Sequence, residues 1–143
     1  MKKYFVWYNL CVKKGIFYLK RILKLKSRKR GIKLIDLHVH TTNSDGTDSP
    51  IEILKLAEEK GLKYLSITDH DTCKSYYDLK DVNLEDYFKG TLIKGVELKC
   101  VYHGRNIDVL GYNFDLDKMN NWITTFYKDK SKKSFLAFVC GMI

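Results

Sequence analysis

Histidine and acidic residues with the spacing of metal ligands lie in three short segments of this chain. The candidate ligands in these segments are His38, His40, Asp45, His70 and Glu97. The chain has four histidines, and three of them lie here. Imidazole and carboxylate groups together suit Mn, Fe or Zn, and such ions can activate water for hydrolysis. The segments therefore predict a metal-dependent hydrolase.

The His-x-His pair lies at the end of a predicted strand, where both rings can reach a single ion. In a strand, residues i and i+2 point to the same side, so His38 and His40 share a face from which Val39 points away. A metal-ligating imidazole also needs a hydrogen-bond partner on its other ring nitrogen. Asp36 lies two residues before His38 on the same face and is the candidate for that role.

A strand–helix–strand unit is predicted around the first two segments. Residues 33–40 are expected to form a buried strand, because they alternate and are partly β-branched. Ser49 and Pro50 open a helix with a capping box, and Gly61 is typical of a helix end. A second buried strand is expected over 62–68, and the unit implies that the two strands run parallel.

The later elements are predicted from the same signals. In chain order they are a helix over 74–90, a strand over 91–98 that ends at Glu97, a turn over 99–106, a strand over 107–112, a polar helix over 116–134 and an apolar end over 135–143. Each candidate motif alone is compatible with a structural role, such as a strand-end cap or a surface carboxylate. Together they follow successive strands and fall at one edge of a parallel sheet, where α/β folds place their sites. Their joint position therefore favours a functional site.

Several motifs resemble those of the PHP domain, the polymerase and histidinol phosphatase superfamily. The matching segments are Asp-Leu-His-Val-His-Thr (36–41), Ser-Asp-Gly (44–46), Ile-Thr-Asp-His-Asp-Thr (67–72), Gly-Val-Glu-Leu (95–98) and, less closely, 104–112. The similarity covers about residues 34–117. It is closest to the stand-alone PHP phosphoesterases, which include nucleoside 3′,5′-bisphosphate phosphatases and 5′→3′ exonucleases that act on short RNA. The resemblance implies an α/β fold, the N-terminal part of a distorted (β/α)7 barrel, with two or three divalent metal ions (Mn, Zn or Fe).

The resemblance also implies a role for each candidate residue. His38 and His40 would hold one ion, and Glu97 would bridge two. Asp45 and His70 would hold another ion. Asp69 would orient a neighbouring group. The implied activity is hydrolysis of a phosphate ester by a metal-activated water. Its substrate would be a phosphorylated small molecule, a nucleotide or a short oligonucleotide.

The fourth segment departs from the family pattern, which commonly has histidine where this chain has Asp108. A carboxylate can still act as a metal ligand at that position. Arg105 is a candidate contact for the substrate phosphate, as are Lys94 and Lys99. Isolated basic residues on a surface are, however, more often simply solvated.

The family's later motifs do not follow Asp117, and the chain stops at Ile143. We therefore expect residues 34–143 to be the N-terminal portion of a truncated PHP domain. The alternative is a catalytically incomplete metal-binding or interaction protein that docks through its basic leader. An enzyme would lose phosphatase activity on His38→Ala, whereas a docking protein would lose partner affinity when residues 1–30 are removed.

The basic leader, residues 1–33, contains twelve Lys and Arg and no acidic residue, so the net charge of +9 becomes about −3 for the remainder. The leader is expected to be helical. Three alternatives fit its composition. The leader is a helix that is solvated or covered by a partner, or it contacts an anionic membrane peripherally through residues 1–30, or it is a tail that binds nucleic acid. Because the positive charge is local, stable binding of duplex DNA is not expected. The four cysteines lack a Cys-x-x-Cys spacing, which favours reduced thiols in a cytoplasmic, potentially membrane-associated protein.

Overall fold

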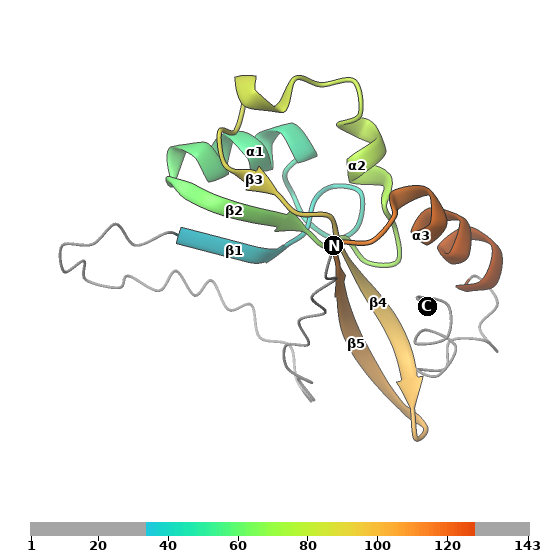
Figure 1. Ribbon diagram of the computed structural model, residues 1–143. Helices are drawn as coiled ribbons and strands as arrows, with labels where there is room; N and C mark the ends of the chain where they lie inside the picture. The colour runs from blue at the N-terminus through green and yellow to red at the C-terminus, as the bar shows by residue number, and fades with distance from the viewer. Residues whose placement is uncertain (1–33, 128–143) are drawn as a thin grey trace, which may run out of the picture.

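In the computed structural model, the described part of the chain, residues 34–127, contains a parallel sheet and a separate two-stranded hairpin (Figure 1). The parallel strands lie in the order β1-β2-β3, and the hairpin pairs β4 with β5 in antiparallel fashion. The predicted α/β class is thus confirmed. The elements are β1 (Leu34–Val39), α1 (Pro50–Glu59), β2 (Leu62–Ile67), α2 (Lys74–Asp78), η1 (Leu84–Asp86), β3 (Thr91–Leu92), β4 (Gly95–Tyr102), β5 (Arg105–Tyr112), α3 (Leu116–Trp122) and η2 (Ile123–Tyr127).

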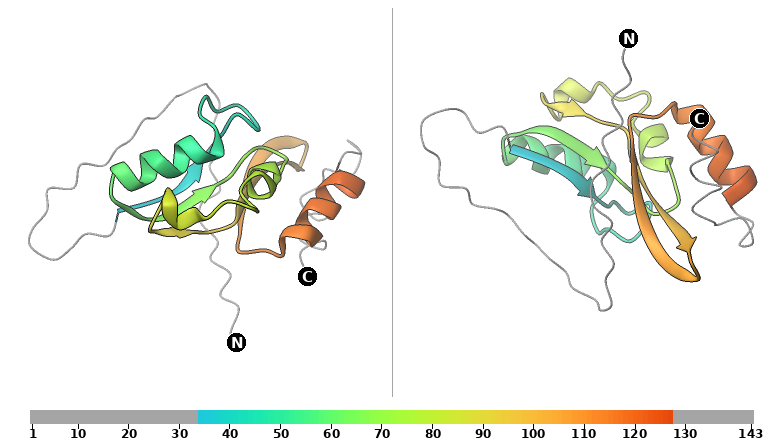
Figure 2. Two further views of the ribbon diagram at one scale, coloured as in Figure 1. Left: turned by 90° about the horizontal axis from the view of Figure 1, so that it is seen from above. Right: turned by 60° about the horizontal axis from the view of Figure 1, so that its bottom comes forward.

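Helix α1 forms as its end signals predict and lies against the parallel sheet (Figure 2). The Ser49 main-chain N–H donates to the Glu52 carboxylate at 2.7 Å, which is one half of the predicted capping box. Gly61 follows the helix with φ +67°, a conformation that glycine adopts without strain. Leu54 of α1 and Leu65 of β2 are both fully buried in the core between helix and sheet. This core holds β1 and β2 parallel, as the strand–helix–strand unit predicts.

A strand forms within residues 33–40 as expected, but the expectation that this strand is buried is wrong. Leu34 and Ile35 are 41% and 56% exposed. Among the described residues, β1 is a terminal strand of the sheet and pairs only with β2. A β-branched run predicts an extended conformation, but it does not show whether a second strand covers it.

The predicted helix over 74–90 is also wrong, because α2 ends at Asp78 and a separate 3-10 turn, η1, follows. The Asn83 side chain donates to the Asp86 carboxylate at 3.0 Å, a local bond that competes with helical pairing. Phe88 is 2% exposed and packs in the core between α1 and the parallel sheet. The chain after α2 therefore follows a course that buries this ring, and it does not continue as a helix.

The predicted strand over 91–98 is divided at Gly95 into two strands that belong to different sheets. Thr91 and Leu92 of β3 extend the parallel sheet, whereas β4 begins at Gly95 and enters the hairpin. At Gly95 the chain passes so close to β2 that an added Cβ would lie 2.2 Å from the Ser66 hydroxyl oxygen. The Gly95 N–H donates to the Tyr76 hydroxyl at 2.7 Å. Side-chain pattern alone does not reveal this close approach.

The hairpin turns at His103 and Gly104, which have φ values of 47° and 72°. Two consecutive residues with positive φ favour a tight two-residue turn. The predicted turn over 99–106 is therefore too long, and β5 starts before the predicted strand over 107–112. The core face of the hairpin packs against α3, which begins where the predicted helix over 116–134 begins (Figure 2).

Two sets of predictions lie outside the described residues. They are the basic leader, 1–33, and the chain after Tyr127, which includes the apolar end. The predicted domain boundary between 33 and 34 therefore stays a prediction. Within 34–127, no helix is long and apolar enough to cross a membrane.

Candidate metal centre

The Glu97 carboxylate lies among three imidazoles. Its Oε2 atom is 2.8 Å from His38 Nε2, 3.0 Å from His40 Nε2 and 3.7 Å from His70 Nε2. Glu97 is 7% exposed, so the carboxylate is largely withdrawn from solvent. The rings themselves are neighbours, because the centroids of His40 and His70 are 4.7 Å apart. One carboxylate and three imidazoles thus converge on one point.

Three elements supply these side chains. His38 lies on β1, and His40 directly follows that strand, while His70 lies in the loop after β2. The prediction that Glu97 ends the third strand is wrong, because Glu97 is the third residue of β4. His70 and Glu97 form an isolated parallel bridge, and the Asp71 N–H donates to the Glu97 carbonyl at 2.8 Å. This main-chain bond fixes β4 against the end of β2.

Asp45 lies on the solvent side of the same cluster, in the loop between β1 and α1. Its carboxylate is 3.2 Å from His40 Nδ1 and 3.6 Å from His70 Nε2. The Asp45 side chain is 67% exposed, in contrast to Glu97. The two ring nitrogens of His40 therefore face different carboxylates, Glu97 on the inner side and Asp45 on the outer side.

Asp108 of β5 approaches the cluster from the hairpin. The register places it directly opposite Lys99 and two pairs beyond Glu97. Because faces alternate along a strand, Arg105, three residues from Asp108, lies on the opposite face at the hairpin tip. The placement gives no support to the predicted phosphate contact of Arg105.

The described residues contain three overlapping groups of potential metal ligands, each with its ligand atoms within 4.8 Å of one another. Every group combines imidazole and carboxylate donors, a set that fits Mn, Fe or Zn. The donor atoms of the cluster are therefore suited to these ions. The groups are His38–His40–Glu97, His40–Asp45–His70 and His70–Glu97–Asp108.

The electrostatics of the cluster favour a deprotonated Glu97. Burial opposes its negative charge, but hydrogen bonds with His38 and His40 outweigh burial and lower the pKa of Glu97 to about 2. Burial likewise acts to lower the pKa of His40, but the hydrogen bond and charge of Glu97, together with Asp45 and Asp69, raise it. The cluster thus keeps an anionic carboxylate at neutral pH, which is the form that binds cations.

Asp69 is buried beside the cluster and accepts four hydrogen bonds. The donors to its two oxygens are the Thr41 N–H at 2.7 Å, the Thr41 hydroxyl at 2.8 Å, the Ser44 hydroxyl at 2.6 Å and the Ser75 hydroxyl. These bonds tie the loop that carries Asp45 to the end of β2 and to α2. Asp69 therefore positions the loop. The three partner residues were not predicted, although Thr41 and Ser44 flank the predicted ligands in sequence.

The expected partnership of Asp36 with an imidazole is not what the structure shows. Asp36 Oδ1 instead accepts a hydrogen bond from the main-chain N–H of His38 at 3.2 Å. A second unpredicted contact fixes β1, since the Tyr112 hydroxyl of β5 donates to the Leu37 carbonyl at 2.7 Å. The hairpin thereby holds the strand that carries the His-x-His pair.

Gly46 is expected to be essential for the position of Asp45. A Cβ at Gly46 would lie 2.3 Å from the His40 carbonyl oxygen, which is main chain and cannot swing away. Overpacking of this kind costs about 1–3 kcal/mol. We expect Gly46→Ala to lower the free energy of unfolding by that amount and to weaken metal binding about tenfold, the smaller of the effects seen when ligand-orienting groups are lost. Urea unfolding and metal titration measure the two effects.

Gly61→Ala is the matched control for this prediction. Gly61 has positive φ but open space around it, so alanine there costs about 1–2 kcal/mol of backbone strain away from the cluster. This variant should lose stability while metal affinity stays unchanged. Equal metal affinity in both variants would contradict the role assigned to Gly46.

The fold and the cluster define an α/β metal-binding protein whose candidate ligands gather where β1 and β2 end and on the adjoining hairpin. The PHP domain family model matches residues 36–142, and the chain belongs to this family.

Known relatives agree with this assignment. The chain is 39% identical over 87 residues to a 5′-3′ exoribonuclease of Haemophilus influenzae, covering 58% of this chain and 30% of that protein. It is 32% identical over 78 residues to a phosphoribosyl 1,2-cyclic phosphate 1,2-diphosphodiesterase of Eggerthella lenta, covering 53% and 29%. The chain thus spans less than a third of the length of these relatives.

A solved structure shows the same fold. It is that of a Bifidobacterium adolescentis protein assigned as a metal-dependent phosphoesterase, with a TM-score of 0.58 and 22% identity. The match covers 71% of this chain and 35% of that one. The described elements thus form part of a PHP-type barrel, as predicted.

Proposed function

We propose that this chain provides the metal-binding part of a PHP-type phosphoesterase, which hydrolyses phosphate esters with a metal-activated water. The observation that carries the proposal is the convergence of His38, His40 and His70 on the buried Glu97. Membership of the PHP domain family supports it. An imidazole cluster held for structure alone would not need a second carboxylate, Asp45, on its solvent side.

The position of each candidate ligand in the cluster indicates its role. Bound divalent ions would polarise the phosphoryl group and lower the pKa of a bound water. His38, His40 and Glu97 would hold ions on the inner side, and Asp45 and His70 on the outer side. Because Asp45 is exposed, the outer side faces the direction from which a substrate enters.

We propose a nucleotide or a short oligonucleotide as the substrate. Two relatives support this choice, since the Haemophilus influenzae protein is a 5′-3′ exoribonuclease and the Eggerthella lenta protein is a phosphoribosyl 1,2-cyclic phosphate 1,2-diphosphodiesterase. Both activities break a phosphodiester bond.

The test is hydrolysis of a short 5′-labelled RNA and of a phosphate monoester by the full chain with Mn²⁺. Activity is expected to disappear with a chelator and to fall at least about 100-fold in His40→Ala, since a candidate metal ligand is lost. His103→Asn is the control, because His103 is exposed at the hairpin turn and asparagine tolerates its positive φ. Equal activity in wild type and His40→Ala would contradict the proposal. A protein that binds metal and hydrolyses neither substrate would favour a non-catalytic metal-binding role.

A further inference from the structure

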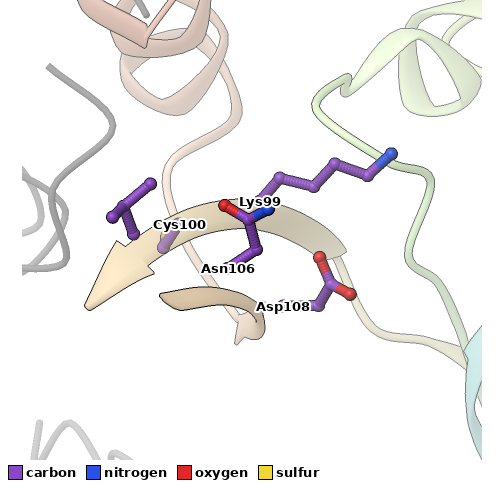
Figure 3. A pocket seen from close by; sticks show the side chains of 5 residues that line it. Lys99, Cys100, Asn106 and Asp108 are labelled. Carbon is purple, nitrogen blue, oxygen red and sulfur yellow. The ribbon is translucent and has the colours of Figure 1, made fainter. Parts of the chain in front are cut away.

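Lys99 lies on the face of the hairpin that carries the cluster ligands. Side chains alternate along a strand, so Glu97 and Lys99 share one face of β4. Asp108 of β5 lies directly opposite Lys99 in the register. Figure 3 shows the Lys99 and Asp108 side chains extending from the hairpin toward the same side. A cationic side chain is therefore placed next to a candidate metal ligand.

This face of the hairpin borders a hollow of about 420 Å³ (Figure 3). Asp108 lines the hollow and also belongs to the group formed with His70 and Glu97. The hollow therefore adjoins the candidate metal centre. A substrate larger than its reacting phosphate must extend beyond the centre, and this hollow offers space for it. Its lining residues are Lys99, Cys100, Val101, Asn106 and Asp108.

The main chain at Lys99 is held in place relative to the cluster. The Lys99 N–H donates to the Asp71 carboxylate at 3.0 Å, and the Asp71 N–H donates to the Glu97 carbonyl at 2.8 Å. Two residues along a strand span about 7 Å. The long side chain of Lys99 can cover this distance and bring its ammonium group to the outer edge of the centre.

The chemistry of an ammonium group suits a phosphate at this place. Lysine carries three donors, so a contact between Lys99 and Asp108 still leaves donors for a substrate oxygen. Lysine binds phosphate as a compact point charge. The carboxylates Asp45, Glu97 and Asp108 surround the centre and would repel a phosphate anion, so a nearby cation that offsets them favours binding.

We propose that Lys99 contacts a phosphate oxygen of the substrate and is a specificity-determining residue of this chain. The proposal rests on the phosphoesterase function proposed above. It assigns the phosphate contact to Lys99 in place of Arg105, which lies on the opposite face of the same hairpin. Substrates with more negative charge beside the reacting phosphate should depend more strongly on Lys99.

The experiment measures the affinity of inorganic phosphate for the Mn²⁺-loaded full chain by calorimetry, together with KM and kcat for the short RNA. Lys99→Gln is expected to weaken phosphate binding about tenfold and to raise KM with little change in kcat, since a hydrogen bond to a charged group is worth about 1.5–3 kcal/mol. Lys99→Arg should retain most of the affinity. Arg105→Gln removes the same charge from the other face and should change affinity less than about twofold.

Each outcome decides between the two proposals. If Lys99→Gln and Arg105→Gln weaken phosphate binding equally, or if neither does, the contact of Lys99 is overturned, whether or not the protein hydrolyses RNA. If the wild type binds no phosphate at millimolar concentration, the contact is also overturned. If phosphate binding depends on Lys99 but no ester is hydrolysed, the contact stands and the phosphoesterase function is overturned.

Discussion

Replacing Glu97 with glutamine is expected to weaken the binding of divalent metal about 100-fold or more, the upper range of effects for groups around a metal. Glu97 Oε2 lies within 3.7 Å of Nε2 atoms of all three clustered histidines. It belongs to two of the three potential ligand groups. A neutral amide keeps the shape of the side chain and removes the negative charge that cations need. Metal titration of the purified variant measures the loss, and hydrolysis of the short RNA should fall with it.

Glu59→Gln is the matched control for the Glu97 variant. Glu59 lies at the end of α1, is exposed and makes the same change of charge. This variant should bind metal as the wild type does. The assignment of Glu97 would be contradicted by a Glu97→Gln protein that is folded and binds metal with the affinity of Glu59→Gln.

The second large effect is expected for Asp69→Asn, which should lower the free energy of unfolding by about 3 kcal/mol even without metal. Asp69 is 1% exposed and accepts four hydrogen bonds. An amide nitrogen in place of one carboxylate oxygen turns an acceptor into a donor and removes the charge that strengthens these bonds. Because the loop with Asp45 depends on them, metal affinity should fall as well, by about tenfold. Urea unfolding of the metal-free protein isolates the structural effect.

Asp81→Asn serves as the control for Asp69→Asn, because Asp81 is exposed in the turn after α2. Surface changes of this kind usually stay within about 0.5 kcal/mol. If Asp69→Asn unfolds at the same urea concentration as Asp81→Asn, the hydrogen bonds of Asp69 do not hold the loop that carries Asp45.

The strand–helix–strand unit was predictable because its signals are local. Ser49 and Gly61 bond to nearby residues at the two ends of α1, and the fixed φ of Pro50 suits the first helical position. The proximity of His38 and His40 follows from the two-residue period of a strand. Once β1 and β2 are parallel, the ends of both strands meet at one edge, which brings His70 beside His40.

The hairpin and its consequences were not predictable from local pattern. An apolar strand over 91–98 looks continuous in sequence, and the break at Gly95 depends on contact with Ser66, which lies in another strand. At this break the chain leaves the parallel sheet and enters the hairpin, whose direction reverses only at His103 and Gly104. The register of the hairpin places Lys99 on the cluster face and Arg105 on the other face. Sequence spacing alone made these two residues equivalent candidates.

The network around Asp69 was also only partly foreseen. An orienting role for Asp69 was expected from the family resemblance, but its partners were not. Ser75 lies in α2 and reaches Asp69 only because that helix packs beside the end of β2. Hydroxyl groups are frequent in any sequence, so tertiary packing decides which of them meet a buried carboxylate.

The most direct test of the central claim is the divalent metal content of the purified full chain, measured by elemental analysis after dialysis, in wild type and in the double variant His38→Ala, His40→Ala. We expect about two ions of Mn, Fe or Zn per wild-type chain, as in two-metal hydrolytic sites, and a loss of most of this metal in the folded double variant. A folded wild-type protein that takes up no divalent ion, or a double variant that retains the full content, would contradict the metal centre on which the proposed function depends.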